Sequence, residues 1–329
     1  MKALLPVLIV TAAIACIPFL GASNVTLNFL IVALLIALAG QGWNILGGYG
    51  GQYSFGHAAF FGTGAYVNAI LQVRYGVNAW LGFVAGIAAG ALVGAIIGSL
   101  AFRSGLKGSY FALVTLAFAE VLRIVASVTP ITGAGVGTLI KLDLRPEAFQ
   151  FQSRAVFFWI ILVLVSVSLL IAAWLEQTRF GAWLTAIREN EDSARALGVD
   201  VFSVKLRAMI LSAAITASAG CFYAQYFLFV DSTIAFGSWI SVEALLGPIV
   251  GGSGTVLGPL VGALVVRVLG EAAKLVAGDA PGIDLAIYGA ALVGVVAFAP
   301  HGIVGLATSL SARLRSRRSE AMAGSVRHG

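Results

Sequence analysis

Hydrophobic and polar positions form long blocks along this chain, in which apolar runs of roughly helix length are separated by short polar connections. A helix needs about 20 residues to cross the hydrocarbon core of a bilayer. The runs do not alternate residue by residue, as the strands of a membrane barrel would. The pattern predicts an all-α polytopic membrane protein with about ten transmembrane helices, or eight if short runs are re-entrant. The predicted runs lie at 3–20, 26–46, 50–72, 79–102, 109–128, 156–175, 206–230, 239–252, 255–276 and 283–305.

One long charged stretch, at 176–207, interrupts this apolar sequence. Residues 182–196 have helical character with an apolar face, and Gly198 is placed to end that helix. Because a bilayer excludes so many charges, the stretch is expected in water between two groups of spans. It is either an ordinary solvated loop or, as its periodicity and length favour, a structured cytoplasmic element that another protein contacts.

Composition and charge agree with a membrane protein and give it an orientation. Hydrophobic residues make up 60% of the chain, charged residues 10%, and the mean hydropathy is +0.99. If Lys2 is cytoplasmic, alternation of the spans puts the basic connection at 103–107, the stretch at 176–207 and the basic tail at 311–329 on the same side. The positive-inside rule requires this arrangement. We therefore expect both termini in the cytoplasm, and the first run to be a retained span rather than a cleaved signal peptide.

The charged stretch divides the predicted spans into two groups of five. Residues 1–155 hold the first five spans, 156–175 the sixth, 206–310 the remaining spans, and the whole chain is one transmembrane domain. An odd number of spans in each half predicts inverted-topology repeats. Glycine-dense segments at 47–57 and 247–255 indicate broken helices. Such breaks either line a translocation pathway or form tight turns between ordinary helices.

Signatures of enzymes are missing from the sequence. There is no G-x-x-x-x-G-K-[ST] phosphate loop, no H-E-x-x-H and no C-x-x-C, and the three histidines are far apart. We expect no catalytic residue, cofactor or metal.

Ionisable residues within spans are costly and are therefore functional candidates. Glu120 can pair with Arg123 on one helix face, and Arg267, Glu271 and Lys274 have the spacing of intrahelical pairs.

Several motifs together resemble the permease subunits of branched-chain amino-acid ABC transporters. The resemblance covers nearly the whole chain and is closest to the longer of the two permease subunits of the leucine, isoleucine and valine importer. The matching motifs are NILGGYGGQYSFGHAAFFG at 44–62, LKGSYFALVTLAFAE at 106–120, AIRENE at 186–191 with ALG at 196–198, GGSGT at 251–255 with GP at 258–259, and PHGIVG at 300–305.

The resemblance implies a subunit of the bacterial inner membrane that works with partners. These are a second, homologous permease subunit, two cytoplasmic ATP-binding subunits and a periplasmic substrate-binding protein. Importers of this type carry an E-A-A-x-x-x-G pattern in the helix that couples to the ATPase. Here Asp192 and Ser193 replace the first two residues, and the usual I-x-L-P continuation is not evident. The coupling candidates are Arg188, Glu191, Asp192, Ala194 and Gly198.

The candidate residues of the translocation pathway are polar or ionisable side chains within apolar runs, together with glycines of the second break. For the polar side chains the alternative is a packing role, and for the two glutamates it is fastening one helix to another. The candidates are Gln52, Ser54, His57, Thr115, Glu120, Glu243, Gly251 and Gly252.

Other functions remain open at this point. A urea or short-amide permease of the same family shares the fold. An ion-driven secondary transporter would use buried carboxylates instead of an ATPase. A membrane enzyme is the most distant alternative.

Overall fold

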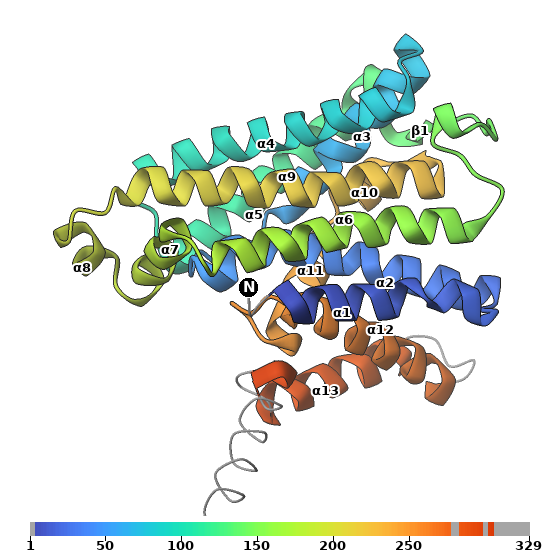
Figure 1. Ribbon diagram of the computed structural model, residues 1–329. Helices are drawn as coiled ribbons and strands as arrows, with labels where there is room; N and C mark the ends of the chain where they lie inside the picture. Colours follow the sequence, from blue (N-terminus) through green and yellow to red (C-terminus); the bar gives the residue numbers. More distant parts are fainter. Residues whose placement is uncertain (1–3, 278–282, 299–301, 306–329) are drawn as a thin grey trace, which may run out of the picture.

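The computed structural model describes residues 4–277, 283–298 and 302–305, and most of them are helical (Figure 1). The only strands in these ranges are β1 (Thr138–Leu139) and β2 (Phe229–Val230). The helices are α1 (Leu4–Ala15), α2 (Asn24–Trp43), α3 (His57–Tyr75), α4 (Ala79–Arg103), α5 (Gly108–Val128), α6 (Arg154–Leu175), α7 (Arg179–Glu189), α8 (Glu191–Ala196), α9 (Val201–Phe227), α10 (Ser232–Ala235), α11 (Ser238–Gly251), α12 (Gly258–Ala277) and α13 (Ile283–Phe298).

The all-α prediction is confirmed, and each predicted apolar run contains a helix. Within the described ranges, six helical segments are long and apolar enough to cross a membrane, and 5–20 forms a shorter apolar segment. The count of about ten spans and the inverted halves stay predictions. The six segments are Asn24–Tyr49, Ala79–Arg103, Gly108–Val128, Arg154–Leu175, Val201–Phe227 and Ser232–Gly251.

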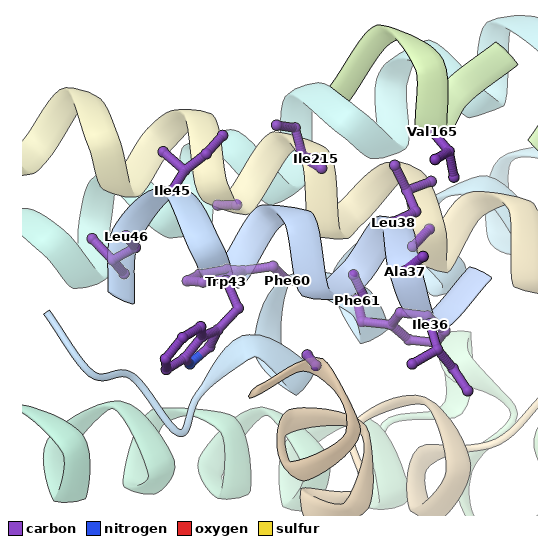
Figure 2. Packing of buried hydrophobic residues seen from close by; sticks show 14 of the residues in the cluster. Ile36, Ala37, Leu38, Trp43, Ile45, Leu46, Phe60, Phe61, Val165 and Ile215 are labelled. Carbon is purple, nitrogen blue, oxygen red and sulfur yellow. The ribbon is translucent and has the colours of Figure 1, made fainter. Parts of the chain in front are cut away.

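Helix α2 is the centre of the bundle. Its sequence is apolar on every face from Ala33 to Ala39, which is typical of a helix that is surrounded by others. It contacts α6, α9, α11 and α12. Figure 2 shows part of this core, with Trp43 and Leu38 of α2 and Phe60 and Phe61 of α3 among its buried side chains. Helix α5, in contrast, buries only one face and leaves much of its apolar surface uncovered.

Helices α4 and α9 approach each other closely along a row of glycines. A carbon added at Gly90 would lie 2.3 Å from Ala217 Cβ, and one added at Gly94 would lie 2.4 Å from Ala213 Cβ. Small residues at this spacing let helix backbones pack closely in membranes, where van der Waals contact contributes much of the association. The glycines recur every fourth residue, from Gly82 to Gly98.

The two ends of the bundle differ in character. Helices α7 and α8 project from one end (Figure 1), which we call the α7–α8 end. At the opposite end the chain 129–153 forms short 3-10 turns, and β1 pairs antiparallel with β2, with Thr138 opposite Val230. Trp80 on α4 donates a hydrogen bond of 2.8 Å to the Pro146 carbonyl and attaches this connection to the bundle.

The first glycine-dense segment breaks the chain between α2 and α3. Helix α2 continues as a π-helical turn at Asn44–Tyr49, and residues 50–56 then have no regular structure. The predicted run at 50–72 therefore becomes a helix only from His57 onward. Gly51 has φ +66°, a left-handed conformation that glycine adopts without strain.

The charged stretch is folded, but not as the single helix expected at 182–196. It forms two helices, α7 and α8, and Asn190 separates them with extended backbone. The Asn190 side chain accepts a hydrogen bond from Ser193 N and caps α8, which is a role that asparagine fills well. Gly198 lies just beyond α8 with φ +85°, as expected of a glycine that ends a helix. Helix α9 begins at Val201, so the end of the charged stretch is already helical.

Some predictions fall outside the described residues. These are the basic tail at 311–329 and the Pro300 and His301 positions of the last motif.

The contact between α4 and α9 should be sensitive to one added methyl group. Replacing Gly90 by alanine is expected to destabilise the purified chain by about 1–3 kcal/mol, because the added carbon would overpack the interface. Ala88→Val adds bulk on an exposed position of the same helix and is the control. Thermal unfolding in detergent measures both. Equal melting temperatures for the two variants would contradict the close packing.

Candidate functional site: the junction of the two breaks with α7 and α8

The two glycine-dense breaks lie against each other, although the contacting residues Asn44 and Thr255 are 211 positions apart in the chain. The Asn44 side-chain amide donates to the Thr255 carbonyl at 3.0 Å and accepts from Gly254 N at 2.8 Å. One turn earlier on α2, Gln41 donates to the Val256 carbonyl at 2.9 Å. Two buried amides thus supply the hydrogen bonds that the unwound backbone of the second break cannot make to itself.

Helix α7 packs on the first break. The Tyr49 hydroxyl donates a 2.8 Å hydrogen bond to Glu176 Oε1, just before α7. A carbon added at Gly50 would lie 3.3 Å from Leu184 Cδ2 of α7. The charged projection is therefore attached to the break by a polar contact and an apolar one.

Arg188, in the last turn of α7, lies between the two breaks. Its Nη1 donates to the Gly48 carbonyl at 2.9 Å. A carbon added at Gly254 would lie 2.9 Å from the same Nη1, and one added at Gly51 would lie 2.7 Å from Arg188 Cγ. The glycines thus leave the space that the arginine side chain fills. A single residue of the charged projection contacts both interrupted segments, and this contact joins the predicted coupling element to the predicted broken helices.

Helix α8 is held to the bundle by a small ionic network around Glu191. Its Oε2 is 2.6 Å from Lys205 Nζ on α9 and 3.6 Å from Lys107 Nζ in the α4–α5 connection. Arg195 Nη2 is 3.0 Å from Glu191 Oε1. The Lys205 and Glu191 side chains are only 4% and 14% exposed, so water screens this pair less than a surface ion pair. Glu191 therefore fixes α8 relative to α9 and α5.

The same network determines the charge state of Glu191. Partial burial by itself would raise the pKa of this carboxyl. The hydrogen bond from Lys205 and the charges of Lys107 and Arg195 outweigh burial and hold the pKa below its ordinary value. The stabilisation from these contacts is present above the ordinary carboxyl pKa and is lost as the pH falls through the lowered value.

The outer surface of the projection is free to meet another protein. Asp192 and Leu197 are 78% and 85% exposed, and Gly198 is exposed as well. Ala194 points the other way and is buried. Among the coupling candidates, Arg188 and Glu191 contact the bundle, whereas Asp192 is largely exposed and lies 3.7 Å from Lys107 Nζ at its edge.

Four of the polar pathway candidates make hydrogen bonds with other residues of this chain. His57 Nε2 lies 2.9 Å from Ser212 Oγ. Thr115 Oγ1 accepts from Phe55 N at 3.2 Å, and Ser54 Oγ accepts from Gly56 N at 3.1 Å. Gln52 is half-buried and donates to the Gly50 carbonyl. These contacts hold residues 50–57 in place, and a lining role for them stays a prediction.

The remaining candidates occupy three different settings. Glu120 is exposed on α5 and pairs with Arg123, as the spacing predicts, with Arg123 Nε 2.9 Å from Glu120 Oε2. Glu243 is half-buried on α11 and lines a cavity with Arg267. Gly251 and Gly252 are buried where α11 ends; a carbon added at Gly251 would lie 1.8 Å from the Gly258 carbonyl oxygen.

Sequence reasoning missed several residues of this junction. Gln41 and Asn44 carried a signal, since they are two amides three residues apart in an otherwise apolar helix, directly before a glycine run. The contacts of Tyr49, Glu176 and Lys205 left no recognisable signal in the sequence, because their partners are distant in the chain.

Comparison with known proteins identifies relatives of this chain. Residues 25–296 match the model of a family described as branched-chain amino acid transport system / permease component. The chain is 28% identical, over 313 residues, to the high-affinity branched-chain amino acid transport system permease protein LivM of Escherichia coli K12, covering 87% of this chain and 71% of that protein.

Two further relatives match shorter parts of the chain. A probable branched-chain amino acid transport permease protein LivM of Methanocaldococcus jannaschii is 27% identical, covering 60% of this chain and 61% of that protein. The autoinducer 2 import system permease protein LsrC of Salmonella typhimurium is 34% identical, covering 43% of this chain and 40% of that protein. No solved structure matches.

The ionic network around Glu191 should hold α8 against α9. Glu191→Gln leaves the buried Lys205 ammonium without its ionic partner, a loss of about 1–3 kcal/mol. We expect trypsin to cleave at Arg188 and Arg195 several-fold faster in this variant. Asp192→Asn removes the neighbouring carboxylate, which is largely exposed, and should change cleavage little. Equal cleavage rates for the two variants would show that Glu191 does not hold α8.

Proposed function

This chain belongs to the family of branched-chain amino acid transport permease components, and we propose that it is the membrane-spanning subunit of an ATP-driven importer of leucine, isoleucine and valine. The family membership agrees with the resemblance carried by the sequence motifs. In this proposal the chain has no ATPase site of its own. Two ATP-binding subunits act on it from the cytoplasm, and a periplasmic binding protein delivers the substrate.

The observation that carries the proposal is the contact of Arg188 with both breaks. A polar projection with an exposed outer surface is useful to a motor protein only if its movement reaches the membrane part of the chain. Arg188 provides that connection, because it contacts Gly48 and Gly254 at once. An amphipathic helix of mixed charge is also a suitable surface for a groove on a partner protein.

The proposed cycle is alternating access. Closure of the ATP-binding subunits moves α7 and α8, and Arg188 carries this movement to the breaks that begin α3 and α12. The permease subunits then rock and open a cavity toward the loaded binding protein. Contacts of the substrate within the pathway have to be weak, so that the substrate can leave again.

Charge supports a cytoplasmic position for the α7–α8 end. This end holds Arg103 and Lys107 together with the basic residues of 179–207, whereas the connection at 129–153 has two basic and two acidic residues. The positive-inside rule then orients the chain in the bacterial inner membrane.

A second permease subunit is proposed to cover part of α5. This helix carries the Glu120–Arg123 pair on a face where both side chains are accessible, 49% and 30% exposed. Charged groups at this depth are costly against lipid, so the face suits a partner subunit or a water-filled pathway between the two permeases.

Reconstitution tests the function directly. Proteoliposomes that contain this chain, its partner permease and the ATP-binding subunits should take up labelled leucine when loaded binding protein and ATP are supplied. This chain alone should take up none, with or without an ion gradient. Uptake by the chain alone under an ion gradient would favour a secondary transporter. Uptake of urea or of autoinducer 2 instead of leucine would agree with an ATP-driven importer but would change its substrate. Autoinducer 2 is included because the chain is similar to LsrC.

Arg188 provides a sharper test of coupling. Arg188→Gln removes a charge-assisted hydrogen bond of about 1.5–3 kcal/mol, so leucine uptake per ATP hydrolysed should fall about tenfold while the subunits still assemble. Arg179→Gln makes the same change at an exposed position of α7 and is the matched control. Unchanged uptake per ATP in Arg188→Gln would count against the coupling role.

A further inference from the structure

A cavity of about 160 Å³ lies between α2, α9, α11 and α12. Most of its wall is aliphatic or aromatic. Figure 2 labels two of the lining side chains, Ile36 of α2 and Phe61 of α3. An apolar cavity of about 150 Å³ can admit a molecule the size of benzene. This cavity therefore has room for a short aliphatic side chain.

Two opposite charges stand at one side of this apolar cavity. Glu243 of α11 and Arg267 of α12 line it, and both also line a second cavity of about 140 Å³. The wall of the second cavity includes Glu271, Lys274 and Tyr288. Because Glu271 and Lys274 follow Arg267 along α12 toward the end opposite α7 and α8, the polar cavity extends toward that end of the bundle.

The hydrogen-bonding capacity of these charges is only partly used. Arg267 Nη2 is 3.5 Å from Glu271 Oε1, and Glu271 Oε1 is also 3.2 Å from Lys274 Nζ. Arg267 Nε is buried and makes no hydrogen bond. The Glu243 side chain makes no direct hydrogen bond or ion pair with any described residue, although Glu243 and Arg267 line the same two cavities. A pair that served only to fasten α11 to α12 would bring the two groups into contact.

We propose that this cleft binds a zwitterionic amino acid with a short aliphatic side chain. The carboxylate accepts from Arg267, the ammonium donates to Glu243, and the side chain occupies the apolar cavity lined by Ile36 and Phe61. The proposal rests on the proposed function and adds a contact site for its substrate within this chain. The ammonium of the ligand meets Glu243, which has no direct side-chain partner, and the carboxylate meets Arg267, whose Nε makes no hydrogen bond.

The shape of the cleft favours an amino acid over a lipid. A phospholipid headgroup also carries an ammonium and an anionic group. Its long acyl chains, however, need far more apolar volume than the roughly 160 Å³ available beside Glu243 and Arg267. A branched side chain of four carbons or fewer is closer to that volume.

Photo-crosslinking on the assembled permease complex tests the proposal. A leucine analogue with a diazirine in its side chain is added without binding protein, and the labelled peptides are mapped. We expect labels in 32–39 and 239–244, displaced by excess leucine. Isocaproate, which lacks the ammonium, and isoamylamine, which lacks the carboxylate, should each compete about tenfold less well, because each forfeits one charged hydrogen bond.

Two variants test whether the charged groups of the cleft bind the ligand. Arg267→Gln and Glu243→Gln should each lower labelling of these peptides about tenfold. Glu147→Gln makes the same carboxylate-to-amide change at an exposed position of the 129–153 connection, outside the cleft, and should leave labelling unchanged. If either cleft variant fails to assemble, the competition series on the unaltered complex still decides the question.

Any of the following results would overturn the site. One is labelling elsewhere in the chain, and another is labelling of the cleft that leucine does not displace. The third is equal competition by leucine, isocaproate and isoamylamine. Labelling of the same peptides by a diacyl phospholipid probe that leucine does not displace would assign the cleft to lipid.

The test is separable from the proposed function. A complex that imports leucine with its binding protein but is not labelled in the cleft contradicts this inference alone. A complex that imports no branched-chain amino acid but is labelled and shows the competition pattern contradicts the proposed function and leaves the site standing.

Discussion

The structure depends on satisfying backbone groups where helices are interrupted inside an apolar bundle. Amide and carbonyl groups that are buried away from water without a partner cost free energy comparable to lost hydrogen bonds. Asn44 and Gln41 supply partners to the second break, and Arg188 supplies one to the first. The two breaks and the end of α7 consequently form one connected unit.

This connection gives a physical route between the projection and the bundle. Glu191 and Lys205 attach α8 to α9, which in turn packs against α2, α3 and α4. Arg188 attaches α7 to the breaks. Movement of the projection would therefore reach the closely packed α9 and the start of α3 together, rather than bending an isolated loop.

Packing density differs between the two sides of α2. Between α4 and α9, glycines such as Gly90 bring the backbones close together and leave no space for a side chain. Between α2, α11 and α12 the bundle keeps cavities, with Glu243 and Arg267 at their shared wall. The described residues thus combine a closely packed side with a side that has room for a small ligand.

Local chemistry determined much of this protein. The long apolar runs predicted the helices, the charged block at 176–207 predicted the projection, and Gly198 predicted where its last helix ends. These features could be predicted because the length of a membrane span and the capping of a helix depend on residues within a few turns of each other. The Glu120–Arg123 pair was readable for the same reason. Tertiary structure alone decided that Asn190 splits the projection, that Asn44 meets Thr255 and that Glu243 shares a cavity wall with Arg267. Two of these features join residues that are far apart in the chain. The third depends on whether Asn190 caps a new helix or continues the preceding one. The periodicity of the sequence does not determine either kind of feature.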